Sequence, residues 1–292
     1  MQTASILADC RNSLGEGPVW NHKAGELMWV DYNEGLVCRF HLTSKKYSAT
    51  KIAETVMVAI PTSRNNLIVA VNKRICIYDP DKNHLLKEVI IQENKPDNRL
   101  NDGKCDANNR LWIGTMNNSA ENGEGALYKI NADLSYEKMD VAFTLPNGIA
   151  WDKRNKKMFV VDSMMKKIFC YDFDLEKGAI SNKCILIDTA GEKGSPDGMA
   201  IDEEDNLWVA FWQGGCVVRY ETKTGKVLER INTPADIPSS CCFGGEALDT
   251  LFITTSRKYD TMENIRKFPM SGGVFTVKPG VKGMITNFFN EA

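Results

Sequence analysis

The amino-acid sequence predicts an all-β fold, a six-bladed β-propeller with about four antiparallel strands in each blade. Two kinds of segment recur along the chain, the first at intervals of 40 to 49 residues, and long helical periodicity is absent. Six copies at this interval take up nearly all of the 292 residues. We therefore expect a single propeller domain over residues 1–292 rather than a β-sandwich or a solenoid, because radial closure leaves only short strand edges.

The first recurring segment contains a turn with a small residue, a short apolar stretch, a polar tight turn and a second, strongly apolar strand. In the six copies this second strand begins at Leu27, Leu67, Leu111, Met158, Leu207 and Leu251. The steps between the copies are 40, 44, 47, 49 and 44 residues. Such even spacing over the whole chain favours six equivalent blades.

The second recurring segment predicts the third strand of each blade. It has an apolar residue, two variable residues and an aromatic or apolar residue, and it starts at Val37, Ile75, Leu127, Ile168, Val217 and Val274. β-branched and aromatic residues bounded by polar turn residues are typical of strands. A fourth strand is expected around Lys51, Val89, Tyr136, Cys184 and Val227. In the last blade, residues 3–8 are expected to take this place.

Composition excludes several classes of function. The chain has 36 Lys and Arg against 38 Asp and Glu, a net charge of -2, and no long basic run, so we expect no nucleic-acid partner. The longest uncharged stretch, residues 206–218, is shorter than the about 20 apolar residues of a membrane-spanning helix. No basic start followed by an apolar segment marks a secretory signal, so a cytoplasmic protein without a membrane partner is expected.

The nine cysteines show no CxxC spacing, which argues against a disulfide framework and against a structural zinc site. Cys38, Cys76 and Cys170 lie in apolar, strand-like segments and are expected to be buried as small hydrophobic residues. The adjacent Cys241 and Cys242 could be redox-active, but core packing is the favoured interpretation.

Four of the six copies carry an oxygen-bearing side chain immediately before the glycine near the start of the inner strand. These residues are Glu16, Asp102, Asn147 and Asp197. Equivalent positions of a propeller lie on one ring around the central channel, so the four side chains should converge. Carboxylate and amide oxygens are the ligands that a hard divalent cation such as Ca²⁺ prefers. Turn formation by Asn-Gly and Asp-Gly is the alternative, although Glu16 between two glycines has no merit as a turn former.

Arg99 and Asn101 directly precede the third ring position. The donors of a guanidinium and the amide of an asparagine could hold a polyhydroxylated or carboxylate-bearing substrate, while a purely structural role of Arg99 is the alternative. The motifs GxSxG, HExxH and GxxxxGK do not occur, so serine hydrolases, zinc proteases and P-loop enzymes are not indicated.

Five separated motifs together resemble one known family. They are LGEGPVW at Leu14, RLNDGKCD at Arg99, LPNGIAWD at Leu145, SPDGMAID at Ser195 and SSCCFGG at Ser239. In this order they are similar to the senescence marker protein, regucalcin and gluconolactonase family, which includes the luciferin-regenerating enzymes of fireflies. The resemblance runs from about residue 9 to about residue 285.

The resemblance implies a six-bladed propeller that holds one divalent cation, usually calcium or zinc, in its central channel and hydrolyses lactones. Carried over to matching positions, it implies Glu16, Asn147 and Asp197 as metal ligands, with Asp197 also serving as general acid and base. The family does not use the position of Asp102 as a direct ligand, so a supporting or turn-forming role is expected there. All ligands carry oxygen, which favours calcium, with zinc or another divalent ion as the alternative.

The resemblance also implies substrate contacts. Arg99 and Asn101 would contact the substrate, and Asn101 would approach the metal or its water. Members similar to regucalcin carry an acidic substrate contact after the Gly-Thr-Met sequence, which here is followed by a shortened stretch over residues 117–124. Glu121 is the candidate for that contact.

We therefore expect a metal-dependent lactonase acting on a sugar lactone or another small lactone, with Asp197 moving the proton. A non-catalytic calcium-binding regulatory protein and a hydrolase of another ester-like substrate are the alternatives. A protein-binding propeller is disfavoured, because it would not need converging acids such as Glu16 at the channel mouth. We expect a small-molecule lactone as the partner and a monomer or weak dimer.

Overall fold

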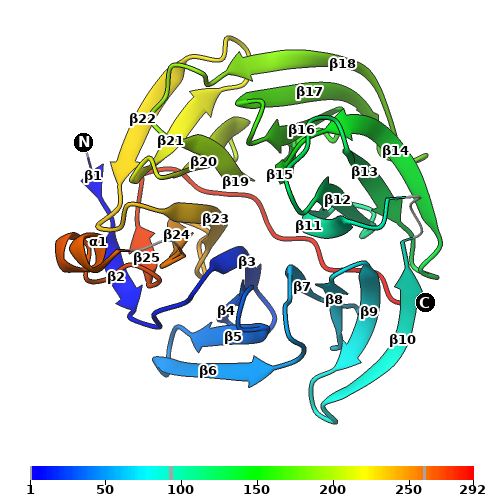
Figure 1. Cartoon of the computed structure of the whole chain (residues 1–292), viewed down its shortest axis with the longest axis horizontal. Helices are drawn as coiled ribbons and strands as arrows, with labels where there is room; N and C mark the ends of the chain where they lie inside the picture. Colours follow the sequence, from blue (N-terminus) through cyan, green and yellow to red (C-terminus); the bar gives the residue numbers. More distant parts are fainter. Residues whose placement is uncertain (1, 92–94, 259–260) are drawn as a thin grey trace.

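Six small antiparallel sheets stand side by side around a central axis (Figure 1). The computed structural model describes residues 2–91, 95–258 and 261–292. Five sheets contain four strands, and the sheet of the fifth blade has an additional fifth strand at its outer edge. The predicted six-bladed β-propeller is therefore confirmed.

Each blade contributes one strand to each of four concentric shells. The innermost strands are β3 (Gly15–Asn21), β7 (Val58–Pro61), β11 (Asn98–Cys105), β15 (Pro146–Trp151), β19 (Ser195–Ile201) and β23 (Pro238–Gly244). The second strands are β4 (Glu26–Asp31), β8 (Leu67–Val71), β12 (Leu111–Asn117), β16 (Lys157–Asp162), β20 (Asn206–Trp212) and β24 (Thr250–Thr255). The third strands are β5 (Leu36–His41), β9 (Arg74–Asp79), β13 (Gly125–Ile130), β17 (Lys167–Asp174), β21 (Cys216–Glu221) and β25 (Val274–Val277). The outermost strands are β6 (Lys46–Lys51), β10 (His84–Ile90), β14 (Tyr136–Phe143), β18 (Ala179–Asp188), β22 (Val227–Asn232) and β2 (Ser5–Ala8).

The N-terminal segment closes the ring. Strand β2 pairs antiparallel with β25, with Ser5 opposite Thr276, so the first residues complete the sixth blade as predicted. The short strand β1 (Gln2–Thr3) pairs in parallel with β22 of the fifth blade. Helix α1 (Met262–Lys267) lies in the connection between β24 and β25.

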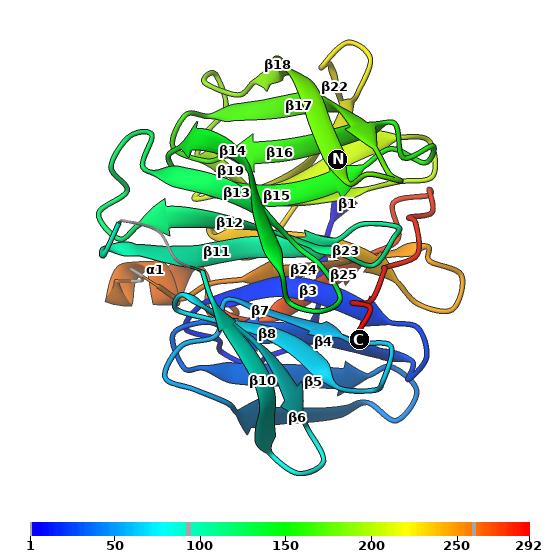
Figure 2. The ribbon, with the colours of Figure 1, turned by 90° about the vertical axis from the view of Figure 1, so that its right-hand side faces the viewer.

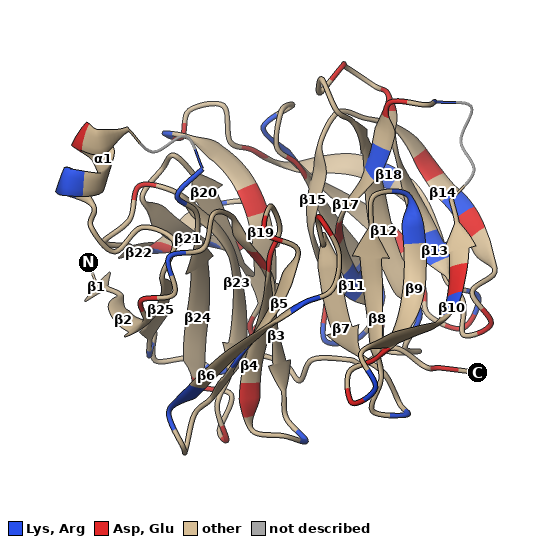
Figure 3. Cartoon of the chain, turned by 60° about the horizontal axis from the view of Figure 1, so that its bottom comes forward, with Lys and Arg blue, Asp and Glu red and all other residues tan. Residues whose placement is uncertain are grey.

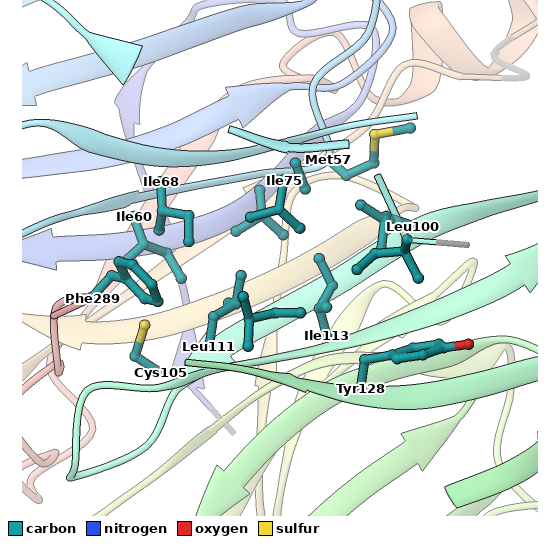
Figure 4. Close-up of a cluster of buried hydrophobic side chains, with 14 of the residues drawn as sticks. Met57, Ile60, Ile68, Ile75, Leu100, Cys105, Leu111, Ile113, Tyr128 and Phe289 are labelled. Atoms are coloured by element: carbon teal, nitrogen blue, oxygen red, sulfur yellow. The ribbon is translucent and has the colours of Figure 1, made fainter. Parts of the chain in front are cut away.

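The hydrophobic core lies between neighbouring blades. Ile60 and Ile68 of the second blade pack with Leu111, Ile113 and Tyr128 of the third blade (Figure 4). Since each second strand is covered on both faces, strands such as β8 are unbroken apolar runs rather than alternating ones, and β8 is buried throughout. The cysteines expected in such strands, Cys38, Cys76 and Cys170, are buried as predicted, and so are Cys241 and Cys242.

The two ends of the propeller differ. Helix α1 lies at one end of the axis and the C-terminal segment at the other (Figure 2). That segment crosses the axis (Figure 1): the N–H of Gly283 donates to the carbonyl oxygen of Leu248 at 2.8 Å, and the N–H of Phe289 donates to that of Pro61 at 2.9 Å. The inner strands begin at the α1 end, where Leu14 forms a bridge with Ser256.

Aspartates at the ends of two second strands accept hydrogen bonds from the backbone just before the inner strands of their blades. The carboxylate of Asp31 accepts from the N–H groups of Ser13 and Leu14 at 2.9 and 3.1 Å. Asp162 accepts in the same way from Thr144 and Leu145 at 2.7 and 3.3 Å. These bonds replace water at backbone groups that a strand ladder leaves unpaired, and they position the starts of β3 and β15.

The outer strands carry charges of both signs (Figure 3). Exposed pairs join adjacent strands, such as Arg74 with Glu88 at 3.3 Å and Lys157 with Asp172 at 2.6 Å. Surface pairs of this kind contribute about 0–1 kcal/mol each. Within the described part of the chain, no helix has the length and apolar character needed to cross a membrane.

Candidate active site and metal centre

A small cavity opens at the α1 end of the channel. Its lining residues are Leu14, Glu16, Tyr32, Met57, Arg99, Asn101, Asp102 and Asn147. Five residues that the sequence singled out therefore share one cavity: Glu16, Arg99, Asn101, Asp102 and Asn147. Asp197 is buried beside them, since its charge acts directly on the carboxyl group of Glu16.

Irregularities in the inner strands accompany the site residues. The ladder between the first and second strands shifts register between Glu16 and Val19, between Leu100 and Gly103, between Asn147 and Ile149, and between Pro196 and Met199. A bulge re-aims the side chains at its position, and bulges are frequent next to active sites. Of the two inner strands that supply no residue to the site, β7 pairs with β8 in an uninterrupted register, whereas β23 shifts register between Pro238 and Ser240.

The glycines after Asn147 and Asp197 allow the inner strands to approach one another. A Cβ atom at Gly148 would lie 2.6 Å from the carbonyl oxygen of Asp197, and one at Gly198 would lie 1.9 Å from the hydroxyl oxygen of Ser240. Both dipeptides lie inside strands, so the interpretation as tight-turn formers is wrong. Asp102 likewise lies inside β11 and lines the cavity, so of the two roles expected for it the turn-forming one is wrong and the supporting one stays a prediction.

The carboxyl groups of Glu16, Asp102 and Asp197 repel one another at this site. Burial raises the pKa of Glu16 well above its usual range, and the charges of Asp197 and Asp102 raise it further. Burial and the charge of Asp102 do the same to the pKa of Asp197. Burial also raises the pKa of Asp102, against an opposing effect of Lys104. The cost of these neighbouring negative charges is the reason that the site would favour a bound cation.

Asn101 connects the two halves of the site. Its Nδ2 donates to Oδ1 of Asn147 at 2.8 Å and to the carbonyl oxygen of Pro146 at 2.9 Å, while its Oδ1 accepts from Nη1 of Arg99 at 2.9 Å. Nδ2 of Asn147 donates to Oγ of Ser163 at 2.8 Å. Because its nitrogen is held by Ser163, Asn147 presents its amide oxygen on the side of Asn101.

Arg99 forms one wall of the cavity. Its guanidinium lies over the ring of Tyr32, 5.1 Å from the centroid, and Nη1 also donates to the carbonyl oxygen of Leu100 at 2.9 Å. Burial lowers the pKa of the guanidinium from its usual high value. Such a half-buried cation is pre-oriented and offers its remaining donors to an oxygen-rich ligand.

The donor set fits a hard divalent cation. Glu16, Asn147 and Asp197 offer only oxygen atoms, and the charge of two carboxylates balances a 2+ ion. In the described ranges, no group of three or more His, Cys, Asp or Glu side chains is arranged to hold a metal. The expected ligand set contains two carboxylates and one amide oxygen, so it is not a group of three acids. The metal site is inferred from the oxygen donors of these three side chains.

Glu121 does not join this group. It is an exposed residue of the connection between β12 and β13, and the cavity lining within the described residues does not include it. Tyr32, Met57 and Ser163 are close to the predicted residues but were not singled out by sequence reasoning. A signal existed for two of them, because Tyr32 and Ser163 each follow the aspartate that ends a second strand, Asp31 or Asp162.

A family model described as "SMP-30/Gluconolactonase/LRE-like region" matches residues 14–257. The chain belongs to this family. The assignment confirms the resemblance that the five sequence motifs predicted. It also extends over all the residues of the candidate site, because the match includes every blade from β3 to β24.

Relatives within the SMP-30/gluconolactonase/LRE-like family cover almost the whole chain. A regucalcin from Xenopus laevis is 30% identical over 296 residues, which cover 98% of this chain and 99% of the relative. A solved luciferin-regenerating enzyme is 30% identical with a TM-score of 0.91, covering 99% of this chain and 100% of that one. A solved regucalcin from Agrobacterium tumefaciens, described as a calcium-binding protein, is 25% identical with a TM-score of 0.93 and covers 99% and 98%.

Proposed function

We propose that this protein is a metal-dependent lactonase that hydrolyses a sugar lactone or another small lactone. The observation that carries the proposal is the convergence of Glu16, Asn147 and the buried Asp197 beside a pre-oriented Arg99 at one end of the channel. Membership in a family whose name includes gluconolactonase supports a lactone as the substrate.

Glu16, Asn147 and Asp197 would hold the cation, for which calcium is the first choice and zinc or another divalent ion the alternative. Relatives include a protein described as calcium-binding. When bound, such a cation supplies Lewis-acid polarisation of a carbonyl oxygen. Ser163 and Asn101 keep the amide of Asn147 in place through the bonds described above.

Asp197 is the proposed general acid and base. Its carboxylate takes a proton from the attacking water and later returns that proton to the alkoxide that leaves when the lactone ring opens. The low exposure of Asp197, 5%, keeps the carboxylate away from bulk water, which would otherwise compete for the proton. A buried, desolvated carboxylate is a stronger base than one in water.

Arg99 is the proposed contact for substrate oxygens. The polar atoms of Asn101 are bonded to Arg99, Pro146 and Asn147, so its proposed contribution is to position Arg99 and Asn147 rather than to bind substrate alone.

The test is a panel of sugar and other small lactones, assayed after chelation and after return of calcium, zinc or another divalent ion. We expect activity that disappears with the chelator and returns with one ion, and loss of activity in Asp197→Ala with a retained circular dichroism spectrum. Asp133→Ala, an exposed acid on the third blade, is the control. Equal activity of Asp197→Ala and the parent protein would overturn the assignment.

A calcium-binding regulatory protein without turnover is the second candidate, favoured by the relatives named regucalcin. It predicts calorimetric binding of calcium, lost in Asp197→Ala, with no lactone of the panel hydrolysed. Hydrolysis of another ester-like compound by the same metal-dependent site is the third outcome. Cytoplasmic location and a monomer or weak dimer remain predictions.

A further inference from the structure

Two cysteines face each other on the outer half of the fourth blade. Strands β17 and β18 are antiparallel neighbours, and Cys170 of β17 is the direct ladder partner of Cys184 of β18. Cys170 is 7% exposed, whereas Cys184 is exposed at the outermost strand of the blade. One thiol is therefore accessible to small molecules, and the other lies behind it.

This pair is distinguished from the other cysteines of the chain, all nine of which fall within the described residues and carry free thiols. In their ladders, Cys38 faces Trp29 and Ala49, Cys76 faces Val69 and Glu88, and Cys216 faces Phe211 and Asn232. Cys105, Cys241 and Cys242 face Leu111, Ile253 and Phe252, and Cys10 lies outside the strands. Among the residues that the structure describes, Cys170 and Cys184 are the only two cysteines that are direct partners in a strand ladder.

The geometry of directly opposite residues suits a disulfide bond. Their Cα atoms lie about 4.5–5.5 Å apart in antiparallel ladders, within the about 4.4–6.8 Å that disulfides span. The thiols also act on one another: burial raises the pKa of Cys170 to about 11, and Cys184 adds to this increase by its charge and as a hydrogen-bond partner. The ammonium of Lys157, paired with Asp172 at 2.6 Å, is close enough to both thiols to interact with them.

We propose that Cys170 and Cys184 form a reversible intrachain disulfide by exchange with a small-molecule disulfide of the glutathione class. The thiolate of Cys184 attacks one sulfur of the small disulfide, forms a mixed disulfide and releases one small thiolate. The thiolate of Cys170 then attacks the sulfur of Cys184, and the second small thiolate leaves. Two protein thiols are oxidised, one small disulfide is reduced to two thiols, and the two protein protons pass to the released thiolates.

The bond would fasten the outermost strand of the blade. Strand β18 leads through residues 189–194 into β19, which carries Asp197, while β15 of the same blade carries Asn147. The bond closes a short loop between neighbouring strands, and such loops stabilise mainly by restricting the unfolded chain. We expect the melting temperature to rise by roughly 5 °C and the activity of the cavity to change little, because neither thiol lines it.

The experiment incubates the full-length protein with reduced or oxidised glutathione and digests it with trypsin after alkylation. Cleavage after Lys167, Lys177, Lys183 and Lys193 separates peptides 168–177 and 184–193, each with one cysteine. We expect these peptides joined, with a loss of two hydrogens in the intact mass, in the parent protein and in the control Cys216→Ser. Cys170→Ser should stop at a glutathione adduct on Cys184, and Cys184→Ser should yield no joined peptide.

A parent protein that accumulates only the glutathione adduct, or that joins Cys184 to a different cysteine, would overturn the proposal. Absence of any oxidation of Cys184 at a glutathione ratio that oxidises a model dithiol would also overturn it. Dithiothreitol should restore the original melting temperature, and a permanent change would contradict reversibility.

Discussion

The inner strands of the second and fourth blades occupy equivalent places and serve different purposes. Val58 of β7 pairs with Ala70, and Asn147 of β15 pairs with Val161. Ala70 and Val161 are equivalent, because each is the fourth residue of its strand when the count starts at Leu67 or at Met158. Both residues are buried. Strand β7 keeps a regular ladder, whereas β15 shifts register directly after Asn147.

This difference shows what one of several equivalent inner strands needs in order to carry a polar site residue. An apolar side chain in a regular inner strand is stabilised by burial alone. A polar side chain at the same place needs partners, and Asn147 finds them in Ser163 and Asn101. The bulge and the glycine after it create the local freedom for this arrangement.

The largest expected effects come from substitutions at the two equivalent positions, Asn147 and Val58: the first should reduce activity and the second should reduce stability. We expect Asn147→Ala to lower kcat/KM by about 100-fold or more, because a proposed ligand is lost, while the protein still folds. Val58→Ala should cost on the order of 2 kcal/mol in unfolding free energy but retain activity per folded molecule. Lactone assays beside urea titrations check both. A variant pair with the opposite pattern would contradict the division between scaffold and site.

Removal of the partner of Asn147 should have an intermediate effect. Ser163→Ala deletes the oxygen that accepts from Nδ2 of Asn147, so the amide can rotate and the affinity for the divalent ion should fall by about 10-fold. Calorimetric titration with calcium measures the change. Ser119→Ala, in an exposed connection, is the matched control. An unchanged affinity in Ser163→Ala would show that the amide is held by Asn101 alone.

The repelling acids predict a specific dependence of stability on pH. Glu16 and Asp197 have raised pKa values in the folded state, so between their unfolded and folded pKa values the folded protein binds more protons than the unfolded chain. Their contribution to stability therefore falls as the pH rises through this window. We expect the metal-free parent to lose stability as the pH rises above the ordinary titration range of carboxyl groups, relative to the double variant Glu16→Gln, Asp197→Asn.

Calcium should remove most of this difference at the higher pH, since the cation takes the place of the protons. Calorimetric melting with and without a chelator provides the measurement. Identical pH profiles of the parent and the double variant would contradict the electrostatic description of the site.

The smallest effect is expected at Glu121. This residue is exposed and outside the cavity lining, so Glu121→Ala should change kcat/KM by less than about twofold, as is usual for surface substitutions. Steady-state kinetics with the best lactone of the panel measures it. A large rise in KM would instead support the substrate contact that the family resemblance implied.

Much of the architecture could be predicted because each blade repeats a local pattern. The second strands begin within one residue of the predicted Leu27, Leu67, Leu111, Met158, Leu207 and Leu251. Closure by the N-terminal residues was also predictable, since the last blade lacked a fourth strand. The sequence placed Glu16, Asp102, Asn147 and Asp197 near one another by their common position before the inner-strand glycines. It placed Arg99 and Asn101 beside them because Asn101 directly precedes Asp102 and Arg99 lies close to it in the chain.

What the sequence by itself determined is the set of blades and the ring of oxygen-bearing residues, because strand period and repeat spacing are local properties of the chain. Only the tertiary structure decided that Asn-Gly and Asp-Gly lie within bulged strands, that Ser163 holds Asn147, and that Glu121 stays outside the cavity. The tertiary structure also showed that Cys170 lies opposite Cys184. This pairing cannot be obtained by counting residues from the turn, because the ladder shifts register on both sides of the pair. These outcomes depend on how distant backbones approach each other around the axis, and no local pattern encodes those contacts.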